Sequence, residues 1–190
     1  MRLPCPEHTR EAKAAPAWVN VSKTLGQIAV FWGFFLAVVP FAIVRLEGHF
    51  GIAGFVSPAS RMAGAALFCS MGCVGVYCGM VFAVHGSGTP LPLDTTTKLV
   101  IAGPYRVVRN PMAITGICQG IAVGLYLGSP FTVLYSLAGI AAWDYMARPW
   151  EEEDLLRRFG EPYRQYREAV RCWIPRLRPY PRLVPGRTRE

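Results

Sequence analysis

Three long stretches of this 190-residue chain contain no charged residue, namely residues 25–44, 62–84 and 111–143. A helix needs roughly 20 apolar residues to cross the hydrocarbon core of a bilayer, which is about 30 Å thick. Each of the first two stretches is therefore long enough for one transmembrane helix. Only 17% of the residues are charged, whereas about a quarter are charged in an average soluble domain. The chain is predicted to be an integral membrane protein.

The third stretch is too long for one crossing and contains a turn signal, Gly128-Ser129-Pro130. Proline cannot continue the helix that precedes it. We predict one helix over residues 110–127 and another over 130–147, each about 27 Å long at ~1.5 Å per residue. A re-entrant hairpin that does not reach the far side is the alternative. The expected fold is all-α, a bundle of about four transmembrane helices followed by a C-terminal cytoplasmic helical segment.

Lysine and arginine residues are sorted between the predicted loops. Only Arg45 and Arg61 lie between the first two spans, and the other 18 of the 20 basic residues lie in the N-terminal segment, in 86–110 or after Ala147. Four spans place these three segments on one face, which the positive-inside rule makes cytoplasmic, with both termini inside. The first span is not a convincing signal peptide, because it begins late and is longer than an h-region. The net charge of +8 fits attraction to anionic lipid and requires no nucleic acid.

The six cysteines do not indicate a metal site. Cys69 and Cys73 are four residues apart on one predicted helix, which would suit a metal or a redox pair. No histidine or acidic residue follows nearby in the sequence to complete a metal site. We therefore interpret Cys69 and Cys73 as small apolar residues that pack within the span.

Four segments make up the predicted organisation. They are a polar N-terminal segment (1–24), two N-terminal transmembrane helices (25–84), a core that carries the chemistry (86–178) and a basic tail (179–190). The second span contains Gly75-Val76-Tyr77-Cys78-Gly79, a small-xxx-small pattern that is typical of close helix packing.

A first polar motif lies between the second and third spans, from Gly103 to Met112. Asn110 is predicted to cap a helix whose first turn contains Pro111. Arg106 and Arg109 would then either snorkel toward headgroups or form an anion site beside the helix N-terminus. The residues alone leave these two interpretations open.

A second polar motif, the acidic run Glu151–Asp154, follows the last span and is predicted to begin a helix that ends at Gly160. Ion pairs at i,i+4 with Arg157 and Arg158 account for Glu153 and Asp154, and none is predicted for Glu151 or Glu152. Such carboxylates can hold an ammonium group or a sugar diol. Asp144, near the membrane edge, is a further functional candidate. Since a hairpin brings its two ends together, we expect Arg106, Arg109 and Asn110 to lie near Glu151 and Glu152.

These motifs together resemble a known family. Thr97-Lys98-Leu99-Val100, Gly103-Pro104-Tyr105-Arg106 and Arg109-Asn110-Pro111-Met112 are followed by a hairpin, then by Glu151-Glu152-x-x-Leu155, Phe159-Gly160, Tyr163, Tyr166 and finally Trp173-Ile174-Pro175. Over residues 86–178 the chain resembles the isoprenylcysteine carboxyl methyltransferase family and its phospholipid methyltransferase relatives. The pattern is closer to the bacterial members, which implies a multi-pass protein of the bacterial inner membrane.

The resemblance implies S-adenosylmethionine as methyl donor and a lipophilic acceptor, such as an isoprenylcysteine-like carboxylate or a lipid, at the cytoplasmic membrane face. It implies Arg109, Arg148 and Glu152 as catalytic residues. The cofactor-binding residues that it implies are Lys98, Leu99, Val100, Tyr105, Asn110, Pro111, Met112, Ala113 and Glu151.

The chain departs from the eukaryotic members of this family at Asn110, where they carry histidine, and at Ala113, where they carry tyrosine. The arginine expected at Ala147 is displaced to Arg148. The sequence leaves two alternative functions open. One is a membrane reductase of the sterol-reductase type with a nicotinamide cofactor, which the short chain disfavours. The other is a non-catalytic membrane protein with a degenerate site.

Overall fold

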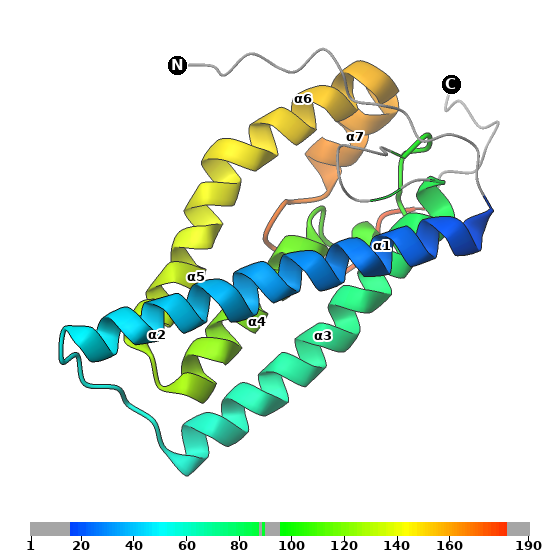
Figure 1. Cartoon of the computed structure of the whole chain (residues 1–190). Helices are drawn as coiled ribbons and strands as arrows, with labels where there is room; N and C mark the ends of the chain where they lie inside the picture. Colours follow the sequence, from blue (N-terminus) through cyan, green and yellow to red (C-terminus); the bar gives the residue numbers. More distant parts are fainter. Residues whose placement is uncertain (1–15, 88, 90–95, 182–190) are drawn as a thin grey trace.

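The computed structural model of the chain describes residues 16–87, 89 and 96–181. Most of the predicted polar N-terminal segment and basic tail therefore lies outside the described residues, as does most of the Gly- and Pro-rich stretch 88–95. Every regular element of the described ranges is helical, which confirms the all-α fold class (Figure 1).

The first helical rod is longer at both ends than the predicted span of 25–44. It consists of α1 (Ala17–Trp32), a π-helical stretch (Gly33–Val38) and α2 (Val39–His49). The π turns come directly before Pro40, which has no N–H to donate and whose ring needs room beside the carbonyl four residues earlier. A wider turn provides that room without ending the helix. The chain leaves the rod at Gly51, whose φ of 65° favours glycine.

The second rod is α3 (Pro58–Gly86), four residues longer at its start than the predicted span. Ser57 caps it, because the Ser57 hydroxyl accepts from the Ser60 N–H while the Ser60 hydroxyl accepts from the Ser57 N–H. The first rod and α3 are both long and apolar enough to cross a membrane, by length and composition.

The third and fourth rods form the predicted hairpin. Helix α4 (Pro111–Leu127) and helix α5 (Pro130–Ala142) are joined at Gly128, which has a φ of 66°. A Cβ on Gly128 would also collide with the backbone of Val56. Of the described helices, only the first rod and α3 pass the test of length and composition for a membrane span, so the crossing of the whole bilayer by this hairpin stays a prediction.

The prediction of a new helix at Glu151 is wrong. Helix α5 continues through a π-helical stretch (Trp143–Ala147) into α6 (Arg148–Phe159) without a break. As in the first rod, the π turns come directly before a proline, here Pro149, so the proline changes the helix register and does not end the rod. Gly160 ends α6 with a φ of 56°, and α7 (Glu161–Ala169) follows.

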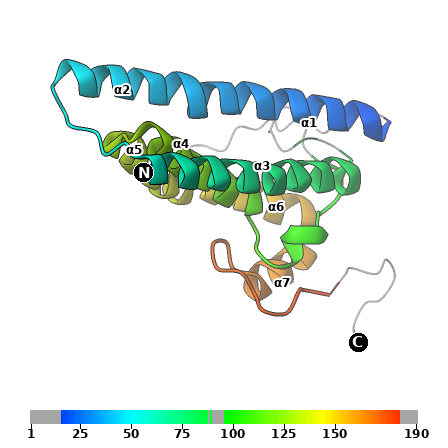
Figure 2. The ribbon, with the colours of Figure 1, turned by 90° about the horizontal axis from the view of Figure 1, so that it is seen from below.

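Glycines allow α3 to pack closely against its neighbours. A Cβ on Gly64 would lie 2.6 Å from the Ala122 carbonyl oxygen of α4. Gly75 lies against Thr115 of α4, and Gly79 against Ile28 of α1, so the predicted small-xxx-small pattern does lie at helix contacts. The first rod lies across the layer formed by α3, α4 and α5 (Figure 2).

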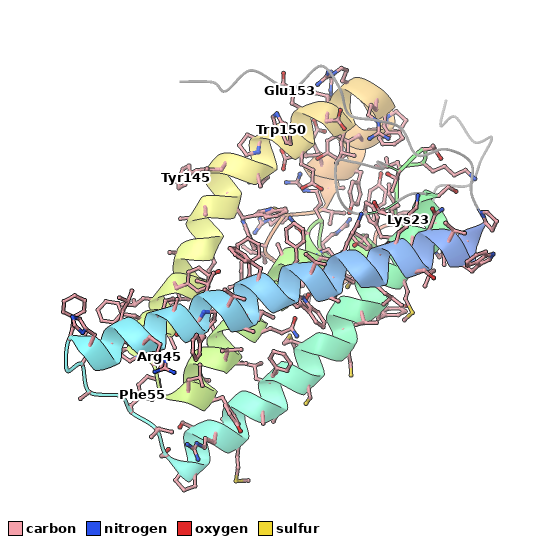
Figure 3. The ribbon with its side chains drawn as sticks, viewed as in Figure 1. Lys23, Arg45, Phe55, Tyr145, Trp150 and Glu153 are labelled. Carbon is pink, nitrogen blue, oxygen red and sulfur yellow. The ribbon has the colours of Figure 1, made fainter. Side chains whose placement is uncertain are left out.

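The bundle has two chemically different ends. At one end the α2–α3 connection is bonded to the α4–α5 turn, since the Phe55 N–H donates to the Gly128 carbonyl at 2.9 Å. At the other end lie the start of α1, the end of α3, the start of α4 and the helices α6 and α7. Figure 3 shows Arg45 and Phe55 at the first end, and Lys23 and Glu153 toward the second. The candidate site lies at this second end.

Candidate functional site

The segment before α4 is extended and divides its side chains between two clusters. Val100 is buried against Cys78 and Val81 of α3. Its neighbours Leu99 and Ile101 point the other way, into a cluster with Tyr163, Tyr166 and Val170 from α7 and its end. This alternation is the period of extended backbone. The segment therefore fixes α7 to the end of the bundle. Lys98, at its start, is exposed.

A 3₁₀ turn, Gly103–Arg106, places Tyr105 in the interior. Gly103 has a φ of 51° and lies against Tyr77 and Val81, so both conformation and space favour glycine. Tyr105 is only 6% exposed, and its carbonyl accepts from the Tyr166 hydroxyl at 2.6 Å. Burial raises the Tyr105 pKa well above its ordinary value, with smaller contributions from Cys78 and Glu151. Tyr105 thus stays a neutral, packed side chain.

Asn110 is the N-cap of α4, as predicted. Its side-chain oxygen accepts from the Ala113 N–H at 3.2 Å, and Pro111 occupies the first helical position. Met112 packs against the cluster that contains Tyr105. These four consecutive residues, Asn110 to Ala113, therefore form the helix start that closes one side of the site.

An ion pair joins the two sequence motifs. The Arg109 guanidinium lies 2.6 Å from the Glu152 carboxylate, with side-chain exposures of 13% and 19%. Arg167 of α7 approaches the other oxygen of Glu152 at 3.8 Å. Desolvation lowers the Arg109 pKa and the charge of Glu152 raises it, and the net shift is upward. The hairpin thus brings Arg109 to Glu152 as expected, and the idea that Glu152 lacks a partner is wrong.

Glu151 differs from its neighbour. Within the described part of the chain it makes no hydrogen bond or ion pair. It keeps accessible surface, yet the protein around it is dense enough that desolvation raises its pKa to about 7. The charge of Glu152 raises this pKa further, and the charge of Arg109 opposes the shift. Glu151 is therefore a solvent-accessible carboxyl group that has no protein partner among the described residues.

Three of the predicted polar residues have structural partners instead. Arg148 pairs with Asp144 at 3.2 Å, one turn earlier, and the Trp173 indole N–H donates to the same carboxylate oxygen at 2.8 Å. Arg106 does not turn toward the acidic run, because its side chain donates to the Tyr180 carbonyl at 2.6 Å. Asp144 and Arg106 thus hold the C-terminal segment.

The sequence placed the helix after Gly160 near the site but assigned no site role to any single residue of α7. Tyr163 and Tyr166 are 2% and 4% exposed, and burial raises the Tyr163 pKa to about 12. The charge of Arg109 opposes this rise in the Tyr163 pKa, and Arg167 extends the ion pair to α7. The spacing of the two tyrosines indicates one helix face. The sequence alone did not show which surface that face would cover.

The fold and the site define a helical membrane protein that carries a cluster of polar side chains where a helical hairpin meets a C-terminal helix. Residues 60–162, just over half of the chain, match the phospholipid methyltransferase family. The chain belongs to this family of membrane methyltransferases, which is of the isoprenylcysteine carboxyl methyltransferase type. The match begins within α3, earlier than the resemblance read from the motifs. No curated protein and no solved structure matches the chain significantly.

Proposed function

We propose that the protein transfers a methyl group from S-adenosylmethionine to a lipophilic acceptor at the cytoplasmic face of the membrane. The family supports methyl transfer in a membrane. The choice of donor and acceptor, and the orientation of the bundle, are our inference from the site and from the distribution of basic residues.

The observation that carries the proposal is the state of Glu151. A carboxyl group with a pKa of about 7, accessible surface and no protein partner is poised to accept hydrogen bonds from a ligand. S-adenosylmethionine offers an ammonium group and two ribose hydroxyls, and both kinds of donor suit a carboxylate. The residues present therefore fit the polar part of this cofactor.

The remaining residues have holding and shaping roles in this proposal. The Arg109–Glu152–Arg167 chain of charges fixes α6 and α7 against the start of α4, and so holds Glu151 in place. Leu99, Val100, Tyr105 and Met112 supply an apolar boundary. The donor, when bound, supplies an electrophilic methyl group, and its sulfonium sulfur becomes a neutral thioether once the methyl group is transferred. Such a transfer depends mainly on alignment and on exclusion of water.

Calorimetry of the purified full-length protein with S-adenosylmethionine tests the proposal. The wild-type protein is expected to bind, and Glu151→Gln to bind at least about tenfold more weakly, since a charge-assisted hydrogen bond contributes roughly 1.5–3 kcal/mol. Glu161→Gln is the matched control, because Glu161 is 59% exposed and pairs with Arg164 on α7. Failure of the wild type to bind, or equal weakening by both variants, would overturn the proposal.

A further inference from the structure

The segment that follows α7, residues 171–178, exposes apolar side chains although the structure holds it firmly. Ile174 is 56% exposed and Leu177 is fully exposed. We call residues 171–178 the arginine loop, because Arg171, Arg176 and Arg178 lie within it and no acidic residue does.

Backbone hydrogen bonds fix the arginine loop to the segment before α4. The Arg109 N–H donates to the Arg171 carbonyl at 3.0 Å, and the Arg176 N–H donates to the Val107 carbonyl at 2.9 Å. Just after the loop, the Tyr180 N–H donates to the Arg106 carbonyl at 2.8 Å. The exposed side chains therefore belong to an ordered loop.

Trp173 sets the depth of the loop along the bundle. Its indole N–H bonds Asp144, which lies 14 residues after the start of α5 at Pro130. This separation is about 21 Å of helix, less than the ~30 Å thickness of the hydrocarbon core. With the α4–α5 turn at the outer boundary, Trp173 lies in the cytoplasmic half of the bilayer, within about 9 Å of the boundary at which tryptophan is enriched. In Figure 2 the chain that leaves α7 first runs toward the end of the bundle that holds the α4–α5 turn.

The loop also forms a hollow of about 350 Å³, lined by Arg171, Ile174, Pro175, Arg176, Leu177, Arg178 and Ala169. Three guanidinium groups can neutralise a phosphate, and the two exposed apolar side chains lie on the same loop. This combination fits an amphiphile with an anionic head and does not fit a free anion.

We propose that the arginine loop binds an anionic phospholipid of the cytoplasmic leaflet, with the phosphate among the arginines and the acyl chains against Ile174 and Leu177. The site is separate from Glu151 and does not depend on the methyl-transfer proposal. It does depend on the predicted orientation of the bundle.

Native mass spectrometry of the full-length protein, equilibrated with dioleoyl phosphatidylglycerol or dioleoyl phosphatidylcholine, tests this proposal. The wild type is expected to retain the anionic lipid preferentially. Arg171→Gln with Arg178→Gln should lower that retention by roughly thirtyfold, from about 1 kcal/mol for each arginine near an anionic surface. Arg157→Gln with Arg164→Gln removes equal charge from α6 and α7 and should leave the preference in place. Equal losses in the two double variants would overturn the proposal.

A second comparison separates a lipid from a free phosphate. Ile174→Ser with Leu177→Ser is expected to weaken retention of the dioleoyl lipid and to leave that of dihexanoyl phosphatidylglycerol unchanged. Displacement of the dioleoyl lipid by inorganic phosphate at equal concentration would identify a phosphate site and contradict the lipid assignment. Thermal unfolding of each variant in detergent, measured in parallel, reports whether the variant is folded.

Discussion

Two adjacent carboxyl groups, Glu151 and Glu152, have different surroundings and therefore different properties. Glu152 is paired with Arg109 and approached by Arg167. Glu151 has no such partner in the described structure, and desolvation raises its pKa to about 7. Glu152 ties α6 to the segment before α4, and Glu151 is the carboxyl group that we propose binds a ligand. The sequence indicated both residues, but it did not show which of them Arg109 would pair with.

The raised pKa of Glu151 leads to a pH dependence of cofactor binding. The carboxyl group is mostly protonated below about pH 7, and in that form it attracts an ammonium group poorly. The affinity for S-adenosylmethionine is therefore expected to fall by up to about tenfold for each pH unit below 7. Calorimetry between about pH 5.5 and pH 7.5 should show this fall and the release of a proton on binding. Glu151→Gln should bind weakly at every pH, and a flat wild-type profile would be inconsistent with the role of Glu151.

Removal of Arg109 should destabilise the protein. Arg109→Gln leaves the mostly buried Glu152 with only the longer contact to Arg167, and breaking such a pair costs about 3 kcal/mol. Arg109→Gln combined with Glu152→Gln should recover part of this loss, because no unpaired charge remains. Thermal unfolding in detergent measures both variants. Glu152→Gln alone is measured in the same way. If the stability losses of the two single variants simply add up in the double variant, Arg109 and Glu152 are not coupled.

At the scale of elements, the sequence predicted the hairpin turn and the N-cap of α4 because glycine, proline and asparagine fix local backbone geometry. Helix ends were predicted less well where tertiary contacts or a change of register decide them. The charge-free run begins at residue 25, but polar residues of α1 such as Asn20 and Thr24 are buried. The acidic run suggested a helix start at Glu151, whereas π turns carry the rod through from α5.

The π-helical stretch Trp143–Ala147 sets the rotation of α6 relative to Arg109. Deletion of Met146, which is 66% exposed, should turn all later residues of the rod by about 100° and shift them by ~1.5 Å. Glu151 and Glu152 would then leave the site, and binding of S-adenosylmethionine should be lost. Met146→Ala keeps the register and should bind normally. Unchanged binding by the deletion variant would show that the register does not position the acidic run.

Helix α3 depends on close backbone approach to α4. A Cβ at Gly64 would lie 2.6 Å from the Ala122 carbonyl oxygen and 2.8 Å from the Tyr126 amide nitrogen, and neither backbone group can move easily. Gly64→Ala should therefore destabilise the bundle by about 1–3 kcal/mol. Gly116→Ala is the control, because nothing lies within 4 Å of its added Cβ. Thermal unfolding should separate the two variants, and equal melting temperatures would argue against this contact.

At the scale of the whole molecule, the motif before α4 and the acidic run of α6 lie at the same end of the bundle. They do so because a helical hairpin returns the chain to the end from which it started. That part followed from the sequence, together with the membrane class and the family. The bond from Tyr166 to Tyr105 and the backbone bonds of the arginine loop did not follow, because they join segments more than 60 residues apart in the sequence. Such contacts become visible only when the chain is folded.

The central claim is that this site transfers a methyl group from S-adenosylmethionine to a lipophilic acceptor. Its most direct test is incubation of membranes containing the protein with donor labelled in the methyl group, followed by extraction into organic solvent. We expect label in an extractable lipid or lipidated peptide with the wild type, and little with Glu151→Gln at equal protein amount. Absence of extractable label above that of membranes without the protein would contradict the claim.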